Sequence, residues 1–97
     1  MTTLFVVVLT YIRPLEEVDA AGPAHVAWLR QGYDRGVFLV SGRRVPRTGG
    51  VIIAKAASLP EVEALMREDP FQRMGLATAQ IVPFEADMLS EAMKPAL

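Results

Sequence analysis

The sequence predicts a small α+β domain with a split β-α-β arrangement that works as a homodimer. Three observations lead to this prediction. The chain has 97 residues, which suits a single domain over residues 1–97. Apolar, β-branched runs alternate with helix-like segments in the order β-α-β-β-α-β. The first and third of these runs are apolar at every position, which indicates strands that are covered on both faces.

The N-terminal part of the chain supplies a strand and a helix. Residues 4–9, Leu-Phe-Val-Val-Val-Leu, favour a strand that ends by the Arg13-Pro14 step. Residues 14–21 indicate a turn or a short helical piece. A helix is expected over residues 23–35, with proline in its first turn and glycine just beyond its end. Its expected buried stripe is Val26, Leu29 and Tyr33, with His25 and Gly32 beside it, and Trp28 and Tyr33 are interpreted as core or interface aromatics.

The middle of the chain indicates a β-hairpin. Residues 37–44 favour a second strand, and residues 51–54, which are apolar throughout, favour a third. The segment 46–50 between them contains Pro46 and Gly49-Gly50, which are typical of a turn. No Lys-Ser or Lys-Thr pair follows the two glycines, so this turn is not expected to bind phosphate as a P-loop does.

A capping box begins the second helix. In the segment Ser58-Leu59-Pro60-Glu61, the serine accepts from a first-turn amide while the glutamate reaches back to the cap amide. The helix is expected to bury Val62, Leu65 and Met66. Asp69-Pro70 ends this helix and begins a short helical turn over residues 71–74.

A fourth strand and a tail complete the chain. Residues 78–84 alternate between polar and apolar, and Pro83 places this strand at a sheet edge, because proline cannot donate to a neighbouring strand. A short amphipathic helix is expected after it, with Met88, Leu89, Ala92 and Met93 on its apolar side.

Homodimerisation follows from the pattern of the inner strands. In a split β-α-β sheet both helices lie on one face, and the first and third strands are central. A central strand with water on one face alternates polar and apolar residues, whereas residues 4–9 and 51–54 do not alternate. The tail is too short to cover the second face. A second copy, packed sheet against sheet about a two-fold axis, is the simplest cover.

The composition excludes several classes of site and partner. Cysteine is absent and only one histidine is present, which excludes disulfides, a cysteine nucleophile and a metal site with several histidines in one chain. The net charge is −1, and the chain lacks the dense stripe of Lys and Arg residues that is typical of a nucleic-acid-binding domain. The first apolar run is far shorter than the ~20 residues of a membrane helix and lacks a charged region before it. We therefore expect neither nucleic acid nor membrane as a partner, and the cytoplasm as the location.

Two residues are candidates for proton transfer. His25 is the one histidine of the chain, and histidine is the residue type that exchanges a proton near neutral pH. It lies at the margin of the expected buried stripe, so it can face a cleft between helix and sheet. A half-buried histidine bonded to a backbone carbonyl is the alternative. A carboxylate such as Asp69 can orient an imidazole and stabilise its charged form, and Asp69 is also a good cap for the next helical turn. Both roles are compatible for Asp69.

The segment Ser41-Gly42-Arg43-Arg44 is a candidate for substrate binding. Arg43 and Arg44 can each hold a carboxylate or a phosphate through two hydrogen bonds. A charged edge strand that resists aggregation is the alternative interpretation. Ser41 has no adjacent base in the sequence, so a nucleophilic serine is not expected. Arg47 is interpreted as loop charge.

The sequence resembles the YCII-related (YciI-like) family of the dimeric α+β barrel superfamily over about residues 4–85. The motifs that carry the resemblance are Pro23-Ala24-His25, Gly36-Val37-Phe38-Leu39-Val40-Ser41-Gly42, Gly49-Gly50-Val51-Ile52, and Asp69-Pro70-Phe71 with Gly75-Leu76. The resemblance implies a ferredoxin-like fold, a dimer with its sheets face to face, and a cleft centred on His25 and Asp69, with Ser41 near it. Arg43-Arg44 stands where some members have Gly-Pro, so no substrate is carried over.

The resemblance also indicates a class of reaction. Most of the family has no assigned biochemistry, while a few relatives resemble lactone-processing enzymes and dehydrochlorinases that use no cofactor. It implies a cofactor-independent lyase or isomerase acting on a small anionic cyclic acid or lactone, with His25 as base, Asp69 orienting it, and Arg43 or Arg44 holding a carboxylate. A non-catalytic dimeric module that binds a small ligand or a partner protein is the alternative. A third hypothesis is a haem- or oxygen-using monooxygenase. Its one support in the sequence is the single histidine, which could serve as an axial haem ligand.

Overall fold

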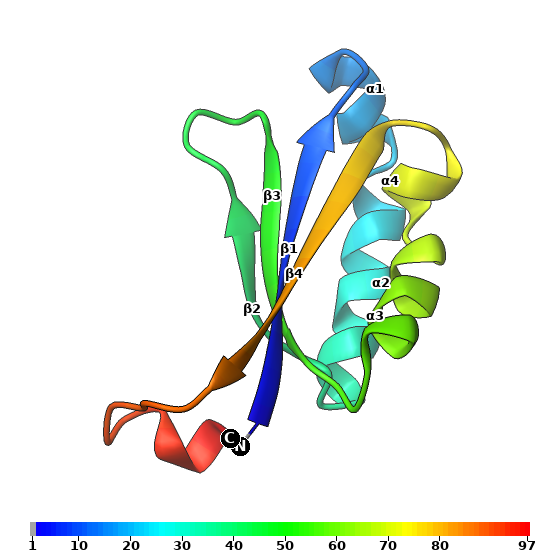
Figure 1. Cartoon of the computed structure of the whole chain (residues 1–97). Helices are drawn as coiled ribbons and strands as arrows, with labels where there is room; N and C mark the ends of the chain where they lie inside the picture. The colour runs from blue at the N-terminus through cyan, green and yellow to red at the C-terminus, as the bar shows by residue number, and fades with distance from the viewer. Residues whose placement is uncertain (1) are drawn as a thin grey trace.

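The computed structural model describes residues 2–97 as a four-stranded antiparallel sheet with helices along one face (Figure 1). The strands are β1 (Thr2–Tyr11), β2 (Phe38–Arg43), β3 (Gly49–Lys55) and β4 (Ala77–Ala86). The helices are α1 (Leu15–Ala20), α2 (Gly22–Asp34), α3 (Leu59–Arg67) and α4 (Pro70–Arg73), and a 3-10 turn, η1 (Lys94–Ala96), lies near the C-terminus. Within residues 2–97, none of the helices has the length and apolar character needed to cross a membrane.

The strand order is that of a ferredoxin-like split β-α-β sheet, which confirms the predicted fold class. The strands lie in the order β2-β3-β1-β4, so β1 and β3 are central while β2 and β4 form the edges. All neighbouring pairs are antiparallel. Pro83 lies on the edge strand β4, opposite Phe5 of β1, as expected for a residue without a backbone N–H.

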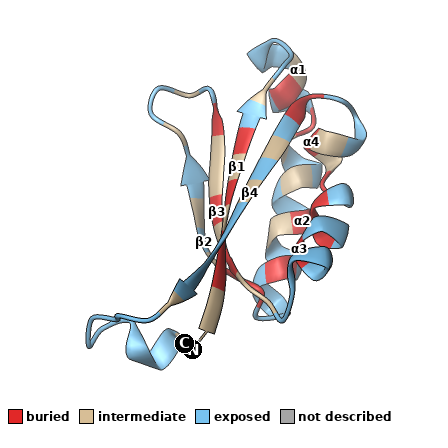
Figure 2. Cartoon of the chain, in the orientation of Figure 1, coloured by how far each residue is buried: buried red, intermediate tan, exposed pale blue. Residues whose placement is uncertain are grey.

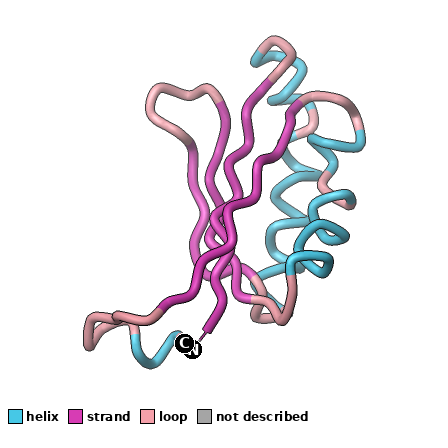
Figure 3. Tube along the Cα trace, in the orientation of Figure 1, coloured by secondary structure: helices cyan, strands magenta, loops and turns pink. Residues whose placement is uncertain are grey.

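The main core lies between the sheet and the two longer helices. Tube and burial views show α2 and α3 on the same side of the sheet (Figures 2 and 3). Alternate residues of β1 and β3 face these helices because successive side chains of a strand point to opposite faces. The buried members are Phe5, Val7, Leu9, Ile52 and Ala54 from these two strands, Val37 and Phe38 at the start of β2, Trp28 from α2, and Val62, Leu65 and Met66 from α3. The burial predicted for the second long helix is therefore confirmed.

A smaller cluster fixes the two short helices to one end of the sheet. It contains Val18, Ala21, Phe71, Leu76 and Ala77, with Tyr11 packed against it. The Tyr11 and Phe71 rings meet edge to face with their centroids 5.9 Å apart. This packing places α1 and α4 beside the end of β1 and the start of β4, next to the cavity described below.

The buried stripe of α2 differs from the predicted one by a small rotation. Trp28 and Gly32 are the buried residues of the helix, whereas Val26 is 45% exposed and Tyr33 is 39% exposed. The cause is the close approach of the helix to β2: a Cβ on Gly32 would lie 2.1 Å from the ring of Phe38. The helix therefore turns its glycine toward the sheet, and His25, two turns earlier, moves inward with it.

Side chains cap α3 and α4 nearly as the sequence predicts. The Ser58 hydroxyl accepts from the Glu61 N–H at 3.4 Å, while the Glu61 carboxylate accepts from the Ala57 N–H at 3.2 Å, one residue before the cap itself. Asp69 Oδ1 accepts from the Phe71 N–H at 3.1 Å and caps α4.

The C-terminal helix predicted around residues 88–93 is not formed. Residues 87–93 are turns and irregular backbone, followed by the short turn η1, and Met88 is 91% exposed. This segment extends away from the end of β4 (Figure 1). A helix shorter than about 12 residues needs a neighbouring surface to be stable, and the tail packs against little of the sheet.

The face of the sheet that carries no helix is apolar along its centre. By alternation with the core residues, it presents Val6 and Val8 of β1 and Val51 and Ile53 of β3, all half-buried, with Val40, Val82 and Phe84 toward the edges at 56%, 45% and 43% exposed. Polar residues on this face, such as Thr10, Gln80 and Lys55, lie toward the strand ends or on β4. The two inner strands are thus apolar on both sides, as the sequence indicates.

Candidate active site

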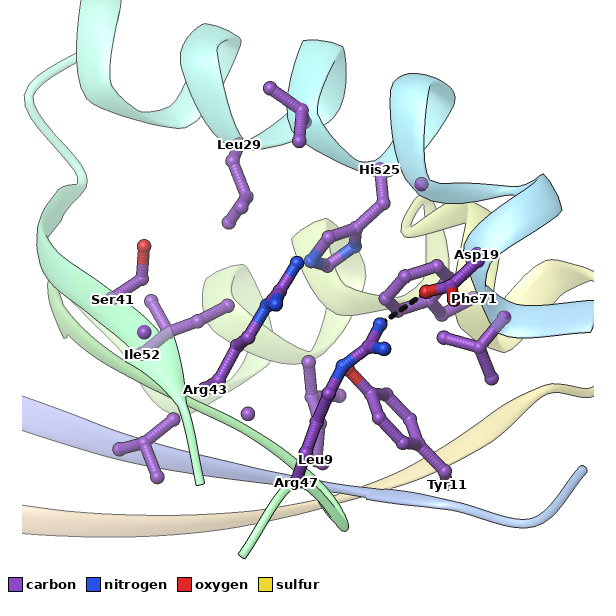
Figure 4. A pocket seen from close by; sticks show the side chains of 17 residues that line it. Leu9, Tyr11, Asp19, His25, Leu29, Ser41, Arg43, Arg47, Ile52 and Phe71 are labelled. Atoms are coloured by element: carbon purple, nitrogen blue, oxygen red, sulfur yellow. Dashed lines mark hydrogen bonds and ion pairs between the residues drawn. The ribbon is translucent and has the colours of Figure 1, made fainter. Parts of the chain in front are cut away.

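A cavity of about 350 Å³ lies between α2 and the sheet, at the end where α1 and α4 are fixed (Figure 4). Apolar side chains of Leu9, Leu29, Ile52 and Phe71 form part of its wall. Polar side chains of Tyr11, Asp19, His25, Ser41, Arg43 and Arg47 also line it. An apolar cavity with a few converging polar groups is the usual form of a small-molecule site.

The structure brings the predicted His25 and Asp69 together at this cavity. His25 Nδ1 lies 2.7 Å from Asp69 Oδ1. Asp69 is fully buried, and the His25 side chain is 13% exposed where it borders the cavity. Two separate helices supply the pair: α2 carries the imidazole, and the residue that caps α4 carries the carboxylate.

Aromatic neighbours fix the plane of the imidazole. The Phe71 ring stacks on it with centroids 3.9 Å apart and planes inclined by 7°. Trp28, one turn along α2, has its ring centroid 5.6 Å away. The Asp69 contact and the Phe71 stack together leave the imidazole little freedom to rotate.

The carboxylate determines which imidazole nitrogen is free. An ionised carboxylate only accepts hydrogen bonds, so Nδ1 carries the proton and donates to Asp69 Oδ1. In a neutral imidazole the other nitrogen, Nε2, is then an acceptor. Nε2 has no hydrogen-bond partner among residues 2–97. The arrangement can therefore take a proton from a molecule in the cavity, and the buried carboxylate stabilises the imidazolium that forms.

Ser41 also borders the cavity, as expected. It lies on β2 opposite Ile52, which places it on the helix-facing side of the sheet. Its hydroxyl lies 2.6 Å from the Tyr33 hydroxyl of α2, so the two share a hydrogen bond. Ser41 can therefore offer a hydrogen bond to a ligand. Its partner Tyr33 is not a base that would activate the Ser41 hydroxyl as a nucleophile.

The structure separates the two arginines at the end of β2. Arg43 lies opposite Gly50 on the helix-facing side and borders the cavity. Arg44 is absent from the cavity wall, and its Nη1 donates to Thr10 Oγ1 at 3.0 Å. Because successive strand residues point to opposite faces, only one of two consecutive arginines can face the cavity. Arg43 is the one placed to hold a ligand.

Arg47, interpreted from the sequence as loop charge, is part of the cavity wall. It extends from the loop between β2 and β3 and forms an ion pair with Asp19 of α1. Its guanidinium carbon lies 5.9 Å from the centroid of the Tyr11 ring. The hydrogen bond from Arg47 lowers the pKa of Asp19, and the positive charges of Arg47 and Arg43 lower it further. The same hydrogen bond raises the pKa of Arg47.

Sequence reasoning missed Arg47, Asp19 and Tyr11 because their proximity depends on the path of a loop. The one local signal is that Arg43 and Arg47 flank a turn, so both lie near the same end of the hairpin.

Among residues 2–97, no group of three or more His, Asp or Glu residues is arranged to hold a metal ion.

Comparisons with solved structures identify two proteins of the same fold. One is 5-chloro-2-hydroxyhydroquinone dehydrochlorinase (TftG) from Burkholderia phenoliruptrix AC1100, in complex with 2,5-dihydroxybenzoquinone; the TM-score is 0.73 with 24% identity, covering 84% of this chain and 93% of that one. The other is a mutant of SnoaB, a cofactor-independent oxygenase from Streptomyces nogalater, with a TM-score of 0.51 and 15% identity, covering 92% of this chain and 96% of that one. Both belong to the dimeric α+β barrel superfamily.

Among curated proteins, none matches the chain. The model of the YCII-related domain matches residues 4–85, the range over which the sequence resembles that family. These residues include all four strands nearly whole, the His25–Asp69 pair and the cavity. The chain therefore belongs to the YCII-related domain family.

Proposed function

We propose that this protein is a cofactor-independent lyase or isomerase that abstracts a proton from a small anionic cyclic acid, lactone or hydroxylated ring. One observation carries the proposal: a buried carboxylate holds His25 by Nδ1 at 2.7 Å, at the wall of an accessible cavity, so that Nε2 remains free to act as a base.

The reaction begins when His25 Nε2 removes a proton from a carbon next to a carbonyl group, which a hydroxylated ring offers in its keto tautomer. The electron pair of the broken C–H bond moves to the carbonyl oxygen, which becomes an enolate. In a lyase, the enolate expels a leaving group from the neighbouring carbon as an anion, and the imidazolium passes its proton to that anion or to water. In an isomerase, the enolate regains the proton from the imidazolium at another carbon. Base catalysis of this kind contributes about 10²–10⁴-fold to the rate.

Arg43 and Ser41 would hold the ring against the base. Arg43 supplies a guanidinium that binds a carboxylate of the ligand, and Ser41 adds a hydroxyl on the same strand. A cavity of about 350 Å³ suits a single-ring molecule. The name of one structural neighbour, a dehydrochlorinase in complex with a dihydroxybenzoquinone, agrees with a ring substrate that loses a proton.

The test measures proton abstraction directly. Purified protein is incubated in D₂O with muconolactone and, separately, with 5-chloro-2-hydroxyhydroquinone, and NMR and chloride release follow deuterium uptake and elimination. Turnover should fall by about 10²-fold or more in His25→Ala and substantially in Asp69→Asn. Arg44→Gln, which changes a charge outside the cavity, is the matched control and should keep full activity.

Two results would contradict the proposal. Unchanged turnover in both folded His25→Ala and Asp69→Asn proteins would eliminate the mechanism. Ligand binding to the cavity without deuterium uptake or elimination in any ring acid would support a non-catalytic binding module.

We further propose that the functional unit is a homodimer in which the two uncovered sheet faces pack together. The apolar centre of that face, formed by Val6, Val8, Val51 and Ile53, supports this assembly. An exposed apolar sheet surface of this kind is a usual interaction site in a soluble domain. The helix-facing cavity lies on the opposite side of the sheet, so dimerisation leaves it accessible.

A further inference from the structure

We propose that Arg47 and Arg43 form an oxyanion subsite at the cavity, and that Asp19 occupies this subsite until an anionic ligand displaces it. The inference rests on the proposed function for the identity of the reacting end of the ligand, a carbon acid beside His25. It goes beyond that function by assigning the opposite end of the ligand, a carboxylate or a ring oxyanion, to Arg47.

The position of Arg47 is the first step of the argument. Its side chain is 28% exposed and reaches from the β2–β3 loop to Asp19, whose side chain is 56% exposed. Figure 4 shows this ion pair beside the Tyr11 ring, with Arg43 directed into the same space from β2. Two cationic side chains and one anionic side chain thus surround one region of the cavity.

The second step is that Asp19 is itself an oxyanion bound at this place. Arg47 donates a hydrogen bond to Asp19 Oδ1, and the charge of Arg43 also acts on that carboxylate. One carboxylate faces two guanidinium groups, so the region keeps an excess of positive charge. The Nε–H of Arg47 is buried and makes no hydrogen bond to Asp19, and the Tyr11 hydroxyl acts on the same guanidinium and raises its pKa, so Asp19 leaves part of the Arg47 donor set unused.

The third step is that this ion pair is easily exchanged. Asp19 lies on a six-residue helix and its side chain is mostly in water, and exposed ion pairs contribute little stability. A ligand oxyanion held in the cavity is surrounded by apolar walls, where an arginine contact is stronger than in water. Released Asp19 becomes hydrated, while the ligand gains a planar, two-pronged donor.

The expected ligand is therefore a single ring with an acidic C–H at one end and an oxyanion at the other. Neutral rings fill the apolar part of the cavity but gain nothing from Arg47. Arg47 therefore determines specificity for anionic over neutral rings. Asp19 competes with the ligand for Arg47, so it sets how strongly an anion must bind in order to displace the Asp19 carboxylate.

The test compares binding of 2,5-dihydroxybenzoquinone, which carries acidic ring hydroxyls, with binding of 2,5-dimethoxybenzoquinone, the same ring without them. Calorimetry gives the dissociation constants, and Trp28, the one tryptophan of the chain, reports occupancy because its ring lies 5.6 Å from that of His25. The variants are Arg47→Gln, Asp19→Asn and the double variant, with Arg44→Gln as the charge-matched control.

The proposal expects about tenfold weaker binding of the dihydroxy probe in Arg47→Gln and severalfold tighter binding in Asp19→Asn, with the control unchanged. In the double variant the effect of Asp19→Asn should disappear, because Asp19 acts only by competing for Arg47. The dimethoxy probe should bind all proteins alike.

Three results would overturn the proposal: weaker binding in Asp19→Asn, an equal effect of Asp19→Asn with and without Arg47, or an equal response of both probes to Arg47→Gln. These measurements concern binding alone, so they are independent of the deuterium-uptake test. Arg47-dependent binding without catalysis would leave the subsite in place while removing the proposed reaction, and catalysis without Arg47-dependent binding would do the reverse.

Discussion

Asp69 both caps a helix and positions the candidate base. Its Oδ1 accepts from the Phe71 N–H, which begins α4, and from His25 Nδ1, which sets the tautomer of the base. Its Oδ2 is buried without a hydrogen-bond partner among residues 2–97. Burying a carboxylate with one oxygen unpaired reduces stability, and such features occur where a site needs a negative charge near the reacting group.

Truncation of Asp69 should therefore reduce stability as well as activity. Asp69→Ala removes the cap of α4 and the partner of His25, so the free energy of unfolding should fall by about 1–3 kcal/mol. Asp69→Asn keeps an oxygen for the Phe71 N–H and should lose less. Urea unfolding at neutral pH measures both, with Asp87→Ala on the exposed C-terminal segment as control. An Asp69→Ala protein as stable as the wild type would show that the capping contact contributes nothing.

At the scale of elements, the contact between α2 and β2 decides where the base points. Gly32 lies against the Phe38 ring, and this close approach turns Trp28 and His25 toward the sheet. A larger residue at position 32 would push the helix outward or rotate it, and the imidazole would move with it.

Gly32→Ala tests this contact. The added Cβ would lie 2.1 Å from Phe38, so the ring or the helix must shift, and we expect a net loss of about 1–3 kcal/mol despite the better helix propensity of alanine. Gly22→Ala in the same helix is the matched control, because nothing lies within 4 Å of its added Cβ. Equal stability of the two variants would mean that α2 does not depend on this close approach.

The Arg47–Asp19 ion pair joins the β2–β3 loop to α1, and its contribution should depend on pH. The pKa of Asp19 is lowered in the folded protein by the hydrogen bond from Arg47. The contact therefore adds stability above the ordinary carboxyl pKa of 3.8 and loses it as the pH falls through the lowered folded value.

Wild type and Asp19→Asn should accordingly differ in urea midpoint near pH 7, and the difference should shrink once the pH falls below the ordinary carboxyl pKa of 3.8. Added salt at neutral pH should also reduce the difference, because both side chains are exposed in part. A difference that grows as the pH falls would have the wrong sign for this ion pair.

Regular elements were predictable from the sequence because they depend on local patterns. Strand order follows from the β-α-β-β-α-β succession of the elements, the edge position of Pro83 from proline chemistry, and the α4 cap of Asp69 from capping rules. The cavity role of Arg47 did not follow, because it depends on how a loop folds back over the sheet. The prediction of a C-terminal helix was wrong, because its apolar residues have no surface within residues 2–97 to pack against.

For the molecule as a whole, the uncovered sheet face is the feature that most needs an explanation. Val40 and Val82 on this face are 56% and 45% exposed, beside half-buried valines and Ile53 on the inner strands. A chain of 97 residues has a small core, and covering this face with a second copy would add to it. Burial of about 500 Å² of apolar surface per subunit would stabilise the pair by roughly 12 kcal/mol per subunit before the loss of rigid-body freedom is counted.

A charge on this face should separate the subunits. Val82→Lys places an ammonium group in the proposed interface, where two copies related by a two-fold axis would each have to bury it, so dimers should dissociate at micromolar concentration. Val45→Lys makes the same change in the β2–β3 loop, where the valine is 98% exposed, and should leave the dimer intact. Sedimentation velocity distinguishes the two states, and the His25–Asp69 site, on the other side of the sheet, should still bind its ring ligand in a folded monomer. A wild-type chain that sediments as a monomer at these concentrations would remove the proposed assembly and leave the apolar face to another partner.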